Sequence, residues 1–152
     1  MRRLLIPALI LLSACATSMT PRANSRPEVV AYVDRAAAAV SAGGIDVCDG
    51  FKGRRWFSDH WYIFMFDANG RTVCHPARPE QIGAMAADLV DSNGKRFGDE
   101  MMRVAAAGGG WVDYMFPRPG QNAPERKSAY VKQVKAPDGK TYVVGSGGYD
   151  LP

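Results

Sequence analysis

The sequence has few cysteines, no cluster of basic residues and no long apolar run, and each of these absences argues against a class of function. Its 152 residues include only three cysteines, and none of them forms a C-x-x-C pair, so redox and haem-attachment chemistry are not supported. The basic residues are scattered, and the GRR run at residues 53–55 is too brief to form a nucleic-acid-binding stripe. The apolar run at residues 4–12 is too short to span a bilayer as a stable helix.

That apolar run has instead the surroundings of a secretory signal. Two arginines precede it, and a stretch of small residues ending in Cys15 follows it. Residues 12–15 resemble the bacterial lipobox, in which the cysteine is acylated and becomes the first residue. An ordinary signal peptide is the alternative, but a cysteine so close behind the run favours a lipoprotein. We expect residues 1–14 to be removed, and the absence of Asp after Cys15 to direct the chain to the periplasmic face of the outer membrane.

The remaining chain is nearly neutral and fits one domain. Removing two arginines leaves 17 basic against 15 acidic residues, a formal charge of +2 instead of +4. Residues 15–27 are small, polar and proline-bearing, as in a flexible tether, and residues 28–150 are long enough for one core. Cys48 and Cys74 are an even pair in an oxidising compartment, so we favour a disulfide over two buried thiols.

The stretch WYIFMFDANGRTVCHP, residues 61–76, predicts a β-hairpin whose first strand is apolar on both faces. Alternate side chains point to opposite sides of a strand. One face therefore carries Tyr62, Phe64 and Phe66, and the other carries Trp61, Ile63 and Met65. A strand with a solvated side would alternate apolar with polar residues, so both faces must be covered. The aromatic face, close to His75, is where we expect a pocket.

Two further parts of the chain supply the covers. Apolar residues recur at helical spacing over residues 28–42, which predicts a helix that ends at two glycines and covers one face. The segment 76–110 includes a turn near residues 81–85 and is too long for a simple connection, so we expect it to form a lid over a small-ligand pocket on the other face. The other predicted elements are a helix near residues 98–107 and strands at 111–116, 128–134 and 141–149. This order predicts an α+β fold, a long N-terminal helix on a five-stranded antiparallel sheet.

The order and spacing of five segments of the chain match a known pattern. The segments are YIFMFDANGRTVCHP, IGAMAADLVDSNGKRF, GGGWVDYMF, KSAYVK and YVVGSGGY. Together they resemble the single Cache domains, which are PAS-like extracellular sensor modules, over about residues 28–149. The resemblance implies a non-catalytic small-molecule sensor, commonly for short carboxylates or amino acids. Receptor members continue into a membrane helix and a signalling region, so we expect signalling here to need a partner such as a sensor kinase or an envelope protein.

The resemblance also implies a ligand site. It places Lys127 near the ligand, where an ammonium is a good counter-ion for a carboxylate, although composition alone favours a surface lysine at a strand start. Tyr114 and Tyr130 would add hydroxyl donors from neighbouring strands, the alternative being core rings with a satisfied hydroxyl. Trp111 and Tyr114 have opposite parity, so at most one faces the pocket. The expected ligand-binding residues are Tyr62, Phe64, His75, Tyr114, Lys127 and Tyr130.

The face that His75 occupies depends on the hairpin turn. A two-residue turn at Asn69-Gly70 places His75 opposite Phe64, on the Tyr62 face. A three-residue bulged turn over residues 68–70 places it opposite Ile63 instead, because one residue of register reverses a side chain. The sequence leaves both arrangements open.

Other candidate sites are weaker. The DSNGK stretch at residues 91–95 lacks the alternating oxygen ligands and closing Glu of a calcium loop, so turn chemistry explains it better. Ser146 lies outside a G-x-S-x-G elbow, with only His60 and His75 as bases. We expect no enzyme activity, no metal and no cofactor. The alternative function is a ligand-free interaction module of the cell envelope, with a filled pocket and an exposed apolar patch.

Overall fold

The computed structural model describes residues 25–58 and 61–152. The expected signal peptide and the expected lipidation site Cys15 lie outside the described residues. Among those that are described, no helix combines the length and the apolar character needed to cross a membrane.

Helix α1 (Arg26–Gly43) opens the domain and agrees with the helix predicted at residues 28–42. Its buried residues recur every three or four positions, which forms one apolar face. They are Val29, Tyr32, Val33, Ala36, Ala37 and Val40. Pro27 lies in the first turn, where its missing N–H removes no helical hydrogen bond. Gly44 follows the helix with a φ of 66°, a conformation that favours glycine.

Five antiparallel strands form a single sheet, as predicted. They are β1 (Phe64–Asp67), β2 (Thr72–Cys74), β3 (Gly110–Pro117), β4 (Pro124–Lys135) and β5 (Thr141–Tyr149). Their order is β2-β1-β5-β4-β3, so the last strand of the chain lies between the hairpin and β4. The ladder of β3 and β4 is longer than predicted, because it continues to a pairing of Pro117 with Pro124.

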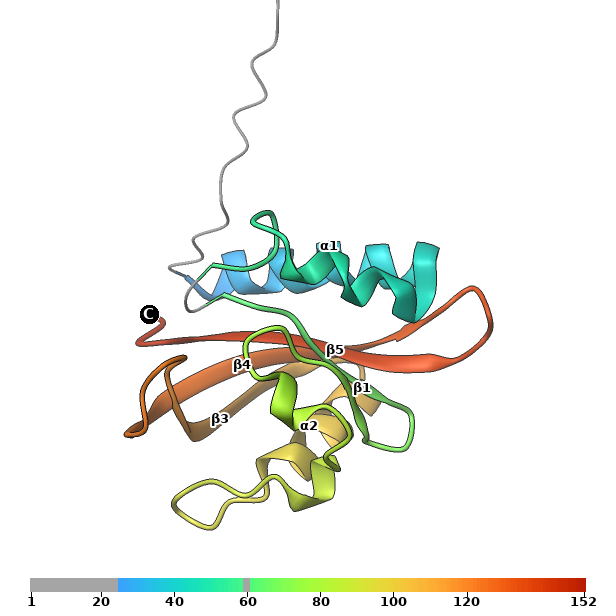
Figure 1. Ribbon diagram of the computed structural model, residues 1–152. Helices are drawn as coiled ribbons and strands as arrows, with labels where there is room; N and C mark the ends of the chain where they lie inside the picture. The colour runs from blue at the N-terminus through green and yellow to red at the C-terminus, as the bar shows by residue number, and fades with distance from the viewer. Residues whose placement is uncertain (1–24, 59–60) are drawn as a thin grey trace, which may run out of the picture.

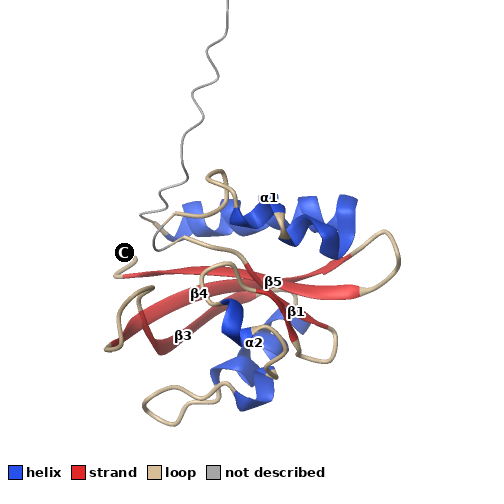
Figure 2. Cartoon of the chain, viewed as in Figure 1, coloured by secondary structure: helices blue, strands red, loops and turns tan. Residues whose placement is uncertain are grey.

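The two faces of the sheet have different covers. Figures 1 and 2 show α1 on one face and, on the other, α2 (Phe97–Ala106) with the segment that leads into it. That segment contains the short 3-10 helices η3 (Pro79–Gln81) and η4 (Ala86–Asp88). Gly98 permits the close contact of α2 with η4, since a Cβ there would lie 2.1 Å from the Ala86 carbonyl oxygen. The predicted arrangement of one cover for each face is confirmed.

The hairpin combines features of both turns that the sequence left open. Phe66 pairs with Thr72, and the Asp67 N–H donates to the Arg71 carbonyl oxygen at 2.9 Å, which leaves a three-residue turn at residues 68–70. This turn by itself would put His75 on the α1 face. The next pairing, of Met65 with Cys74, leaves Val73 as the extra residue of a β-bulge. Because of this extra residue, the side chains after Val73 point to the faces that a two-residue turn would have given them. Cys74 packs in the α1-side core, and His75 lies on the opposite face.

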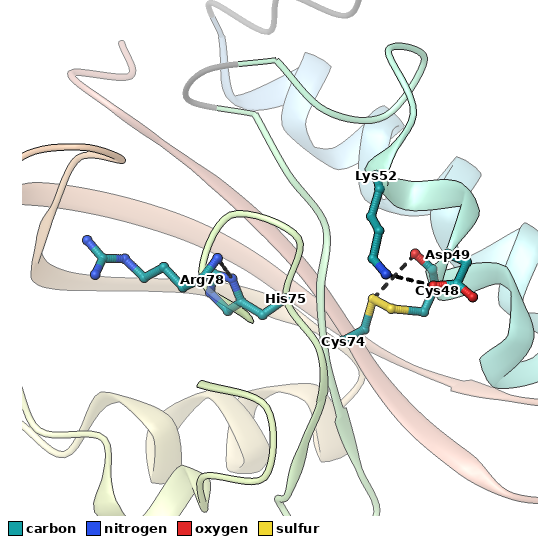
Figure 3. Close-up of a disulfide and its surroundings, with 6 residues drawn as sticks. All are labelled: Cys48, Asp49, Lys52, Cys74, His75 and Arg78. Atoms are coloured by element: carbon teal, nitrogen blue, oxygen red, sulfur yellow. Dashed lines mark hydrogen bonds and ion pairs between the residues drawn. A yellow bond between two sulfur atoms is a disulfide. The ribbon is translucent and has the colours of Figure 1, made fainter. Parts of the chain in front are cut away.

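A disulfide joins Cys48 to Cys74, as the sequence favoured, with 5.8 Å between the Cα atoms. Cys48 ends the 3-10 helix η1 (Gly44–Cys48), which follows α1. Figure 3 shows the Cys74 side chain directed toward Cys48 and the His75 side chain directed to the other side of the strand. The chain after α1 is thus fixed covalently to the strand that leads into His75.

Candidate functional site

A cavity lies on the face of the sheet that α2 covers. The space between its walls measures about 300 Å³ when the part that is open to solvent is included. It is lined by Tyr62, Phe64, Phe66, His75, Gln81, Leu89, Phe97, Met101, Tyr114 and Phe116. This wall is mostly aromatic and aliphatic, and none of its residues is acidic. The aromatic face of the hairpin therefore borders a cavity, at the position where we expected a pocket.

Five of the six predicted ligand-binding residues come together here. Tyr62, Phe64, His75 and Tyr114 line the cavity. Lys127 is not part of the wall, but its Nζ donates a hydrogen bond to the Tyr62 hydroxyl oxygen at 2.5 Å. The imidazole of His75 lies 4.9 Å from the Tyr62 ring and 6.3 Å from the Phe64 ring.

Tyr130 does not share this site, and the expectation that it does is wrong. It packs with the α1-side core, and its ring lies 5.6 Å from that of Trp111. The reason is strand geometry, because Lys127 and Tyr130 are three residues apart on β4 and point to opposite faces. The same rule correctly predicted that only one of Trp111 and Tyr114 would face the pocket.

Lys127 is a buried cation with aromatic surroundings. Its side chain is 1% exposed, and its Nζ lies 4.3 Å from the Tyr62 ring centroid and 5.4 Å from that of Tyr149. Within the described part of the chain, no carboxylate is within ion-pair distance of it. Burial, and to a smaller extent the charge of Arg78, lowers the pKa of Lys127 to about 7. An anion beside Lys127 would raise this pKa again and favour the charged ammonium.

Arg78 is a second cation at the site, and sequence reasoning missed it. Its guanidinium lies 5.0 Å from the Phe116 ring centroid, and Nη2 donates to the Pro117 carbonyl oxygen at 3.4 Å. Its charge lowers the pKa of both His75 and Lys127. The sequence HPARP indicates a turn at this point, but nothing in it shows that the arginine side chain reaches Phe116 and Pro117.

The contacts of His75 determine which ring nitrogen carries its proton. Burial is the largest cause that lowers the His75 pKa to about 3, followed by the charges of Lys127 and Arg78, so the ring is neutral at physiological pH. Nδ1 accepts a hydrogen bond from the Arg78 backbone N–H at 3.0 Å (Figure 3). The proton must then reside on Nε2. No other described residue bonds Nε2, which leaves a donor at the cavity wall.

Two buried tyrosines add hydroxyl donors. Desolvation raises the pKa of Tyr62 and Tyr114 well above the ordinary value of 10, so both stay protonated. Because Lys127 donates to the Tyr62 oxygen, the Tyr62 proton is directed elsewhere. Ser146, weighed above as a nucleophile, donates its hydroxyl to the Tyr62 carbonyl oxygen at 2.8 Å and thus holds the backbone of that residue.

The chemistry of the arrangement is that of an anion site beside an apolar cavity. Neutral donors come from Tyr62, Tyr114 and His75, while positive charge comes from Lys127 and Arg78. The cavity lining contains no acidic group. Outside the lining, Glu80 lies 3.8 Å from Arg78 Nη1, so Lys127 is the cation of the site that has no acidic partner among the described residues. Such a site favours a small negatively charged group attached to an apolar body.

Comparison with known proteins shows which family the chain matches. A family model described as "Single Cache domain 2" matches residues 22–150. A sensor histidine kinase of Rhizobium johnstonii, MctS, is 31% identical over 88 residues, and a methyl-accepting chemotaxis protein of Pseudomonas putida, McpP, is 30% identical over 89 residues. Both alignments cover 58% of this chain, which spans less than a fifth of the length of either relative.

Solved structures show the same fold. A periplasmic sensor domain of a chemotaxis protein is 30% identical, with a TM-score of 0.61 over 82% of this chain and 94% of its own. A Cache chemosensory domain, described as recognising carboxylic acids, is 27% identical, also with a TM-score of 0.61, over 80% of this chain and 84% of its own.

Proposed function

Since the chain belongs to the single Cache domain 2 family, we propose that it is a sensory, non-catalytic domain that binds a short carboxylate. The observation that carries this proposal is the buried Lys127 ammonium, which has no acidic partner within the described residues and donates to a cavity-lining tyrosine. A buried charge is costly unless it is paired. A ligand carboxylate would provide that pairing, with the hydroxyls of Tyr62 and Tyr114 and the Nε2–H of His75 as donors.

The cavity wall supports a ligand with one charged end and a short apolar body. Phe64, Phe66 and Met101 are apolar, and none of the lining residues could pair with a ligand ammonium. We therefore favour simple carboxylates over amino acids within the class. A domain described as recognising carboxylic acids is among the similar structures, which supports the same choice.

The proposal is tested by a thermal-shift screen of the full chain against short carboxylates and amino acids. A carboxylate should raise the Tm of the wild type, and Lys127→Met should abolish that rise. The control is Lys135→Met, which removes an exposed lysine from the same strand and should leave the response intact. A panel in which no compound stabilises the wild type, or an undiminished response in Lys127→Met, would refute the proposal.

We further propose that the domain is a periplasmic lipoprotein, acylated at Cys15, that acts through a partner such as a sensor kinase. Support comes from the lipobox-like sequence and from the periplasmic sensor domain among the similar structures. Metabolic labelling with a fatty acid, followed by separation of inner and outer membranes, tests this. The label should accompany the wild type into the outer membrane and be absent from Cys15→Ser; an unlabelled wild type would contradict the proposal.

A further inference from the structure

A loop over the cavity is attached to the edge of the sheet by one carboxylate. The loop, residues 89–96, connects η4 to α2. Asp91 Oδ1 accepts hydrogen bonds from the backbone N–H groups of Asn93, at 2.8 Å, and Lys95, at 2.9 Å, which close the turn. The second oxygen of Asp91, Oδ2, accepts from the backbone N–H of Met115 on β3 at 2.9 Å.

Lys95 makes a second attachment beside the first. Its Nζ donates to the Asp113 carbonyl oxygen at 2.5 Å and pairs with Glu100 of α2 at 2.8 Å. β3 is an edge strand, whose outer N–H and C=O groups have no strand to pair with. Asp91 and Lys95 satisfy two of these groups. We call the contacts of Asp91 and Lys95 with β3 the edge clamp.

The edge clamp lies close to three residues of the cavity wall. Tyr114 lies between the two clamped positions of β3. Leu89 is the first residue of the clamped loop, and Phe97, the first residue of α2, follows the loop directly. The Phe97 ring stacks on the Tyr114 ring, with 4.3 Å between centroids and 9° between planes. The Gly98 N–H donates to the Leu89 carbonyl oxygen at 3.4 Å and links the start of the loop to α2.

We propose that Asp91 is a positioning residue of the ligand site. By holding the loop on β3, it fixes Leu89 and Phe97 against Tyr114 and so sets the length of the apolar ligand body that the cavity accepts. The inference rests on the proposed carboxylate-binding function. A carboxylate suits this role because both of its oxygens accept, whereas the amide of asparagine has one acceptor and one donor. Asp91→Asn must therefore lose either the turn or the strand contact.

The test is the chain-length selectivity of the full chain for acetate, propionate and butyrate, measured by calorimetry. In Asp91→Asn, the ratios of the three affinities should move toward one, because the wall that discriminates between them is no longer held. The matched control is Asp138→Asn. Asp138 closes the β4–β5 turn with a bond to the Lys140 N–H at 3.0 Å, outside the cavity, so its loss should leave the ratios unchanged.

A measurement without ligand accompanies the titrations. Amide hydrogen exchange at Met115 and over residues 89–98 should be faster in Asp91→Asn than in the wild type, with β5 protected equally in both. If Asp91→Asn does not fold, Lys95→Met removes the other half of the edge clamp and should shift the selectivity in the same direction. Wild-type selectivity retained in a folded clamp variant overturns this inference alone. A wild type that binds none of the three acids overturns the proposed function, and this inference with it.

Discussion

At the scale of single residues, Lys127 is the central group of the proposed anion site. Its pKa is lowered from 10.5 to about 7 because the folded protein buries the ammonium without a described acidic partner. Between these two values the unfolded chain binds more protons than the folded one, so the free energy of unfolding rises with pH. The slope is at most about 1.4 kcal/mol per pH unit. Below pH 7 both states are protonated, and the full cost of burial applies.

The first prediction follows from this cost. Lys127→Met removes the charge and keeps the length of the side chain, so the variant should be more stable than the wild type at pH 6. The difference should shrink as the pH rises from 7 toward 10. Urea unfolding at several pH values measures it. A variant less stable than the wild type at pH 6 would show that Lys127 is a structural residue.

The second prediction concerns the pH dependence of binding. A carboxylate ligand needs the charged ammonium, so its affinity should be constant from pH 5.5 to just below 7 and then fall by up to about tenfold per pH unit. Above pH 7, binding should take up a proton, which calorimetry in buffers of different ionisation enthalpy detects. Affinity that is unchanged between pH 6 and pH 9 would exclude coupling to Lys127.

The third prediction concerns the tautomer of His75. Nitrogen chemical shifts of the imidazole should show a neutral ring protonated on Nε2, since Nδ1 accepts from the Arg78 backbone, and this state should persist down to pH 5. His75→Phe keeps the ring contacts but loses the donor, so carboxylate affinity should drop by about 1.5–3 kcal/mol. A ring that titrates near pH 6.5 would contradict the assignment.

Strand parity decided which site residues could be assigned to a face of the sheet from the sequence. Parity correctly separated Trp111 from Tyr114, but it was not applied to Lys127 and Tyr130, which an odd spacing places on opposite faces. His75 could not be assigned, because its face depends on a bulge at Val73 that no turn rule specifies. The position of Arg78 over the site follows from tertiary contacts with Phe116 and Pro117, which local sequence does not encode.

At the scale of elements, the hairpin places a disulfide-bonded residue next to a cavity-lining one. Cys74 points to α1 and forms the disulfide with Cys48, while the next residue, His75, lines the cavity. The covalent bond therefore restrains the strand end from which the histidine projects. The sequence predicted the elements well because their apolar periodicity is strong. It did not predict the 3-10 helices η3 and η4, which are too short to have a periodicity of their own.

The fourth prediction concerns this disulfide. The two cysteines are 26 residues apart in the sequence. For a loop of this length, the chain-entropy relation predicts that loss of the bond lowers the free energy of unfolding by about 3.5 kcal/mol. Dithiothreitol should lower the Tm of the wild type and leave that of the double variant Cys48→Ser/Cys74→Ser unchanged. The double variant should also bind carboxylates more weakly. A Tm of the wild type that is insensitive to reductant would contradict the bond.

At the scale of the whole molecule, the two faces of the sheet differ, since one packs against a continuous core and the other borders the cavity. One face is covered by the long helix α1 and holds a continuous apolar core. The other is covered by α2 and a series of short turns (Figure 1). It retains a cavity with donors and nearby cations but no acidic lining residue. The fold could be predicted because both covers are visible in the sequence. The edge clamp that positions the second cover could not, because it joins side chains of one loop to the backbone of a distant strand.

The most direct test of the anion site compares two molecules of nearly the same shape. Calorimetric titration of the full chain at pH 6 with propionate and with propionamide separates the need for negative charge from the fit of the apolar body. We expect saturable binding of propionate by the wild type, no binding of propionamide, and no binding of either by Lys127→Met. Binding of the amide as tightly as the acid, or of the acid by Lys127→Met, would contradict the proposed anion site.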